Sequence, residues 1–143
     1  MINYGELPDD LSKEYLETLF IDMLNFIESD QALEQIDFII DGLWELSNRQ
    51  WHTYEILNES IKIRIDSFLR DNINKGVWRS HPILFLNKLL GIIGNLGLSN
   101  SYISIKEMEI NNVPEKYVDK IRKFIMEVDY HKKGQIENPY SML

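Results

Sequence analysis

The sequence predicts an all-α fold, either one compact bundle or a short array of helical hairpins, with about five to six helices. Apolar residues recur at helical spacing in several segments of roughly 15–20 residues. Residues that begin and end helices stand between these segments. The chain has 143 residues, of which 44% are hydrophobic, and therefore fits a single helical domain over residues 1–143.

A short N-terminal arm over residues 1–8 is expected to precede the first helix. Asp9 or Asp10 can cap that helix, because a carboxylate accepts hydrogen bonds from the free N–H groups of a first turn. The helix should run to about Glu28, since its apolar residues recur every three or four positions. These apolar residues are Leu16, Leu19, Phe20, Met23, Phe26 and Ile27.

Two further helices are expected before the middle of the chain. The second spans about residues 31–48, and the third begins with a cap at Thr53 and ends near Asn72. Residues 61–66 alternate between isoleucine and charged side chains, which is the pattern of a strand. The longer register favours a helix there, and the strand stays open as an alternative.

The fourth helix, over about residues 82–97, is apolar nearly all round and therefore belongs at the centre of the bundle. Gly91, Gly94 and Gly97 recur along it at every third position. Glycines at this spacing let a neighbouring helix approach closely, and Gly97 can end the helix because glycine accepts left-handed backbone. The spacing does not match a phosphate-binding glycine loop.

The remainder of the chain is expected to hold a short helix over about residues 105–111, with a short strand over 102–106 as the open alternative. A last helix opens at Pro114 and runs to about His131. Residues 134–143 should form a polar C-terminal tail. Consecutive helices with short connections pack as antiparallel hairpins.

The composition narrows the class of protein. The chain has no cysteine, which excludes disulfides, thiolate metal sites and a cysteine nucleophile. No apolar run approaches the ~18–20 residues that span a bilayer, and the first residues do not resemble a secretory signal. Ala32 is the only alanine, whereas isoleucine and asparagine are abundant, which is typical of an AT-rich bacterial or phage gene. We expect a soluble, cytoplasmic protein.

Patterns for catalysis or metal binding are incomplete. Glu127 and His131 lie one turn apart and could share a metal ion, although a histidine near a helix end is the more frequent explanation. Residues 129–140 have the frame of a calcium loop, but His131 and Lys133 stand at ligand positions and Tyr140 replaces the glutamate. We therefore predict no catalytic site, cofactor or metal, and keep a metal-binding helical enzyme as an alternative.

The charged residues are unevenly distributed along the chain. Residues 1–60 hold fourteen acidic and two basic residues, a net charge of −12. Residues 61–143 hold nine acidic and thirteen basic residues, a net charge of +4. In the second helix, the spacing of four carboxylates places them on one face, and the first helix adds three more. The predicted acidic surface consists of Glu14, Glu17, Asp22, Glu34, Asp37, Asp41 and Glu45.

Three interpretations of these carboxylates are open. They can form a solvated face that keeps the protein soluble. They can dock on the basic residues of the last helix, which are Lys116, Lys120, Arg122 and Lys123. They can also bind a basic partner such as a nuclease, whose basic groove binds phosphates. Direct binding of nucleic acid is disfavoured because the chain lacks a dominant basic patch.

Trp51 adds a candidate contact residue to this surface. We expect it in a loop and partly exposed, beside Arg49 and His52. Tryptophans that are exposed on a free protein often become the centre of an interface. Trp51 therefore joins the seven carboxylates as a predicted partner-binding residue.

A small, acidic, cysteine-free and helical chain with these carboxylates resembles the immunity proteins of bacterial toxin systems, especially those of contact-dependent growth inhibition. The resemblance covers the whole chain in size and character. It implies a tight stoichiometric complex that blocks or covers the active site of a cognate toxin, often a nuclease. It implies no catalytic residues. A helical adaptor domain without inhibitory action is the alternative from the same class of binding proteins.

Overall fold

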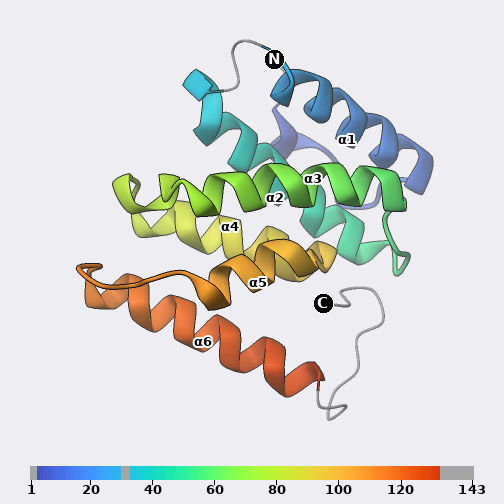
Figure 1. Cartoon of the computed structure of the whole chain (residues 1–143). Helices are drawn as coiled ribbons and strands as arrows, with labels where there is room; N and C mark the ends of the chain where they lie inside the picture. Colours follow the sequence, from blue (N-terminus) through green and yellow to red (C-terminus); the bar gives the residue numbers. More distant parts are fainter. Residues whose placement is uncertain (1–2, 30–32, 133–143) are drawn as a thin grey trace.

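Residues 3–29 and 33–132 are described by the computed structural model of the chain (Figure 1). Within them lie six α-helices and no strand, which confirms the predicted all-α bundle. Residues 61–66 and 102–106 both lie in helices. The elements are η1 (Tyr4–Glu6), α1 (Lys13–Ile27), η2 (Leu33–Gln35), α2 (Ile36–His52), α3 (Glu59–Asn74), η3 (Val77–Ser80), α4 (Ile83–Leu96), α5 (Ser99–Glu107) and α6 (Glu115–Lys132).

Helix α4 lies at the centre of the bundle, as its apolar sequence predicts. It packs against α2, α3, α5 and α6, and α6 covers the side away from α1 (Figure 1). A Cβ atom at Gly91 would lie 3.1 Å from the indole nitrogen of Trp44, and one at Gly94 would lie 3.6 Å from the Phe124 ring. The glycines therefore let both α2 and α6 approach α4. Gly97 ends the helix with a φ of 68°, as expected.

The buried apolar side chains form one hydrophobic cluster that reaches from η1 to α6. The helices other than α4 each contribute the residues of one face, in agreement with the helical period of the sequence. Among the tryptophans, Trp78 is buried, whereas Trp44 and Trp51 are half-buried. The bundle is therefore closed around α4, and charged residues occupy the outer faces of the other helices.

The predicted caps of the first and third helices were wrong, and α2 begins at Ile36 and ends at His52 rather than spanning about residues 31–48. Helix α1 begins at Lys13 and is capped by Ser12, whose hydroxyl oxygen accepts from Tyr15 N at 3.2 Å, rather than by Asp9 or Asp10. Helix α3 begins at Glu59 and is capped by the side chain of Asn58. Thr53 instead ends α2, and its hydroxyl donates back to the carbonyl of Gln50 at 2.7 Å. The Thr53 oxygen accepts from Glu55 N, four residues before α3 begins, so Thr53 stands too early in the chain to cap that helix.

The predicted short helix over 105–111 was displaced, because α5 starts at Ser99. Its N-cap residue, Leu98, supplies no side-chain acceptor. The buried carboxylate of Asp66, on α3, accepts from the backbone N–H groups of Asn100 at 3.1 Å and Ser101 at 2.8 Å. The Ser101 hydroxyl lies 2.5 Å from the same carboxylate. A residue of α3 thus performs the capping that the start of α5 needs.

We expect Asp66→Ala to lower the free energy of unfolding by about 1–3 kcal/mol, because it leaves buried N–H groups of α5 without an acceptor. Asp71→Ala is the matched control on the same helix. Asp71 pairs with Lys75 on the surface, so its loss should change the free energy by less than about 0.5 kcal/mol. Urea denaturation of both variants measures the difference, and equal losses would contradict the role of Asp66.

Helices α5 and α6 are joined by a buried tyrosine. The Tyr102 hydroxyl donates to the Asp129 carboxylate at 2.8 Å. Burial raises the pKa of Tyr102 above its ordinary value, and the hydrogen bond to Asp129 and the negative charge of that residue raise the pKa further. Deprotonation of Tyr102 is therefore less favourable in the folded chain than in the unfolded one, so high pH favours unfolding.

The contribution of Tyr102 to stability should be complete below the unfolded-state pKa of about 10 and should be lost as the pH rises from there towards the higher folded-state pKa. We expect Tyr102→Phe to lower the free energy of unfolding by about 1 kcal/mol near neutral pH. The decline of stability above about pH 10 should also be shallower than in the wild type. Urea denaturation from pH 7 to 11 tests both effects, with the exposed Tyr15→Phe as control.

Candidate protein-binding surface

The predicted carboxylate row on α2 is largely paired within the protein. Asp41 lies 2.8 Å from Lys88 Nζ, and Asp37 lies 3.6 Å from His81 Nε2. Lys88 lies within α4, and His81 lies two residues before that helix begins. Glu45 forms an ion pair with Arg49 at 2.7 Å, one turn further along α2. Asp41 and Glu45 are therefore engaged in internal ion pairs, whereas Asp37 lies beside a histidine that attracts it only when protonated. Asp37 and Asp41 still face solvent.

Lys88 is held more firmly than a typical surface lysine. Its ammonium group lies 5.3 Å from the centre of the Trp44 ring as well as beside Asp41. Further along the same two helices, the amide of Asn95 donates to Asn48 Oδ1 at 2.8 Å. A row of polar contacts thus runs along the junction of α2 and α4. The carboxylates of α2 help to hold this junction together.

The alternative in which the acidic helices dock on the last helix was wrong for the residues that the structure describes. No ion pair links residues 3–29 or 33–60 to the basic side chains Lys116, Lys120, Arg122 and Lys123. All four of these basic residues are exposed on α6. The acidic helices instead pair with α4 and, through Glu28 and Arg64 at 2.6 Å, with α3.

Four of the seven predicted carboxylates make no ion pair with any described residue. Glu14, Asp22 and Glu34 are exposed, and Glu17 is half-buried. Three of the four lie on α1, and Glu34 lies in η2, directly before α2. Asp22 is close enough to Tyr4 that its negative charge adds to burial in raising the pKa of that phenol. Negative charge on α1 is therefore left without an ion pair among the described residues.

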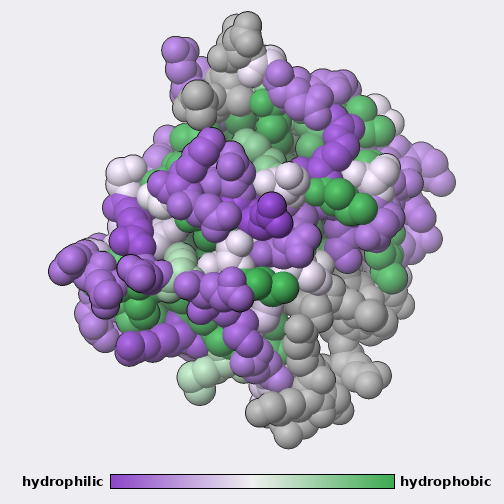
Figure 2. All heavy atoms as spheres, viewed as in Figure 1, coloured by the Kyte–Doolittle hydropathy of each residue, from purple (hydrophilic) through white to green (hydrophobic). Residues whose placement is uncertain are grey.

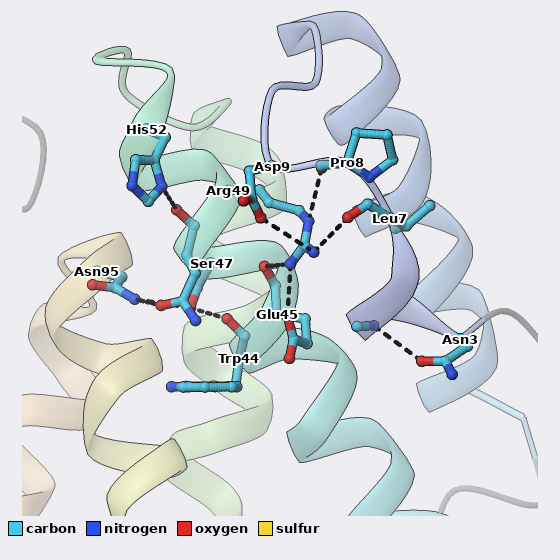
Figure 3. Close-up of polar contacts among 12 residues, drawn as sticks. Asn3, Leu7, Pro8, Asp9, Trp44, Glu45, Ser47, Arg49, His52 and Asn95 are labelled. Atoms are coloured by element: carbon cyan, nitrogen blue, oxygen red, sulfur yellow. Dashed lines mark hydrogen bonds and ion pairs between the residues drawn. The ribbon is translucent and has the colours of Figure 1, made fainter.

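The N-terminal arm is fixed to the end of α2 by a buried arginine (Figure 3). The guanidinium of Arg49, which is 4% exposed, donates to the carbonyl of Leu7 at 2.7 Å and to that of Pro8 at 3.1 Å. It also donates to the backbone and side chain of Glu45. Asp9 lies 3.7 Å away with its side chain in solvent. The arm thereby places the Asp9 carboxylate beside the last turn of α2.

We expect Arg49→Met to lower the free energy of unfolding by about 3 kcal/mol or more, because it leaves Glu45 and two carbonyl groups without their donor. Amide hydrogens of residues 3–12 should then exchange faster, as measured by mass spectrometry. Arg64→Met removes an exposed pair and should change stability by less than about 1 kcal/mol. Unchanged protection of the arm in Arg49→Met would show that this contact does not hold it.

Trp51 lies in the last turn of α2 and is half-buried, whereas a loop had been predicted for it. Two other apolar residues nearby are more exposed. Tyr54 and Ile56, in the connection between α2 and α3, are 66% and 51% exposed. The helical period could not identify them, because they lie outside any helix. The one feature of the sequence that could have indicated their exposure is that two apolar residues stand in the segment after a helix end.

One hollow and the placement of the histidine, aspartate and glutamate side chains bear on the question of a metal or catalytic site. A hollow of about 400 Å³ between α3 and α5 is lined mainly by polar residues, with Arg70 and Glu107 among them. Within the described ranges, no three histidine, aspartate or glutamate side chains gather so as to hold a metal ion. The side chain of His131 and most of the calcium-loop frame lie outside the described residues.

Hydrophilic residues predominate on the face shown in Figure 2, where apolar residues appear in small separate areas.

No helix among the described residues is long and apolar enough to cross a membrane. No family model, curated protein or solved structure matches this chain. Evidence for what this surface binds therefore comes from its charges and its exposed apolar side chains.

Proposed function

We propose that this chain is a binding protein that neutralises a basic protein partner in the manner of a bacterial toxin immunity protein, and that the partner is a nuclease toxin acting in the same cytoplasm. The observation that carries the proposal is the division among the acidic residues. Asp41 and Glu45 are paired internally, and Asp37 lies beside His81. The carboxylates of α1 are left without an ion pair among the described residues.

Glu14 and Glu17 lie three residues apart on α1, and like charges at that spacing repel each other and reduce the stability of the free protein by a small amount. A partner with basic residues would remove that repulsion and would be attracted from a distance. Such attraction raises the rate of association more than the affinity. A nuclease needs basic residues where it binds phosphates, so it presents the complementary charge.

Co-expression tests the proposal directly. The resemblance to immunity proteins implies that the toxin domain is encoded beside the gene for this chain. That domain alone should stop growth of the host, and co-expression of the chain should restore it. The purified proteins should form a complex of fixed stoichiometry by light scattering, and the complex should no longer cleave nucleic acid. Growth arrest that persists, with no complex, would contradict the proposal, and a complex that stays active would favour an adaptor.

Charge reversal should identify the face involved. We expect the triple variant Glu14→Lys/Asp22→Lys/Glu34→Lys to slow association with the toxin domain about tenfold or more in 50 mM salt, and less in 300 mM salt, because salt screens attraction between exposed charges. Stopped-flow fluorescence measures the rates. The control triple variant Glu107→Lys/Asp119→Lys/Glu127→Lys changes the net charge equally, on α5 and α6. Equal slowing of association in both triple variants would show that the carboxylates of the first variant have no special role.

A further inference from the structure

The connection between α2 and α3 presents apolar side chains to solvent at one end of the acidic half of the chain. Tyr54 is 66% exposed and Ile56 is 51% exposed. The next residue, Leu57, is buried and joins the hydrophobic core, so the connection is anchored directly beside its exposed part. Exposure of two large apolar residues within three positions is unfavourable in the free protein, and a partner that covered them would gain from their burial.

This connection is held in one conformation by hydrogen bonds. The amide of the buried Gln50 donates to the carbonyl of Glu55 at 2.9 Å. The Thr53 hydroxyl donates to the carbonyl of Gln50, and the same oxygen accepts from Glu55 N at 3.2 Å. The Asn58 side chain caps the first turn of α3, which follows directly. A loop fixed in this way loses little conformational freedom when it binds.

Tyr54 adopts a backbone conformation that an aromatic residue rarely takes. Its φ is 56°, in the left-handed region that glycine and asparagine accept more readily. The free protein therefore carries strain at a position whose ring is mostly in solvent. Tyr54 directly follows the C-cap residue of α2, a position where left-handed backbone often ends a helix and glycine is the usual residue. A tyrosine there carries a conformational cost that ending the helix does not require.

The surroundings of the connection indicate the chemistry of the partner. Arg49, in the last turn of α2, holds the arm so that Asp9 stands at this end of the helix with its side chain 95% exposed. Glu55 and Glu59 are also exposed on either side of Ile56 in the sequence. The apolar residues thus share this end of the molecule with carboxylates. A complementary surface has an apolar hollow bordered by lysine or arginine.

We propose that Tyr54 and Ile56 are the apolar anchor of the complex with the basic protein partner, an inference that rests on the proposed function. The carboxylates of α1 attract the partner, and the two anchor residues hold it after contact. Tyrosine is enriched among the residues that dominate binding energy, because it buries a large area at low loss of side-chain freedom. The anchor therefore governs dissociation, whereas the charges govern association.

Kinetics with the full chain and a catalytically inactive form of the toxin domain test this assignment. Tyr54→Ala and Ile56→Ala should each raise the dissociation rate about 30-fold, the effect of a strong interface residue, and leave the association rate within about twofold. Ile103→Ala is the matched control, since Ile103 is 48% exposed on α5. Its dissociation rate should stay within about threefold of the wild type.

Tyr54→Gly separates binding from folding. Glycine accepts the positive φ, so the variant should melt at the same temperature as the wild type or higher, yet dissociate as fast as Tyr54→Ala. If the variants of Tyr54 and Ile56 dissociate at the wild-type rate, the assignment of these residues as the anchor is overturned and the proposed function is left intact. Absence of any complex with the wild-type chain would overturn both. NMR order parameters below about 0.6 for residues 54–56 of the free protein would also overturn the anchor.

Discussion

The need to bury α4 on nearly all sides determines how the charges of this protein are used. Glycine at position 91 lets α2 approach α4 so closely that Trp44 lies against the helix backbone. This approach brings the outer edge of α2 within reach of Lys88 and His81. The exposed carboxylates of Asp41 and Asp37 then lie beside these two side chains. The pairing of the acidic residues follows from the position of the apolar helix.

Apolar periodicity was sufficient to predict the number of helices, the central place of α4 and the purpose of its glycines, because each depends on residues close in sequence. Helix boundaries were predicted less well where distant residues supply the hydrogen bonds. Arg49 holds the carbonyl groups of Leu7 and Pro8, and α1 begins only at Lys13. Asp66 reaches α5 from α3 and moves its start to Ser99. Spacing alone does not reveal such contacts.

The candidate surface was predictable in the same limited sense. The spacing of acidic residues showed which of them share a face of a helix, but the neighbour of that face depends on how the helices cross. Asp41 and Glu45 proved to be paired and Asp37 lies beside His81, while the α1 members make no ion pair among the described residues. Tyr54 and Ile56 gave no periodic signal, because the conformation of their connection is set by Gln50 and Thr53.

The capping of α5 by Asp66 has a consequence for how the protein comes apart. A helix of nine residues has little stability of its own, because the cost of starting a helix is recovered only over a longer length. The first turn of α5 depends on a carboxylate that is in place only while α3 is folded. Local opening of α3 should therefore release α5 as well, and the two helices should behave as one cooperative unit in native-state hydrogen exchange.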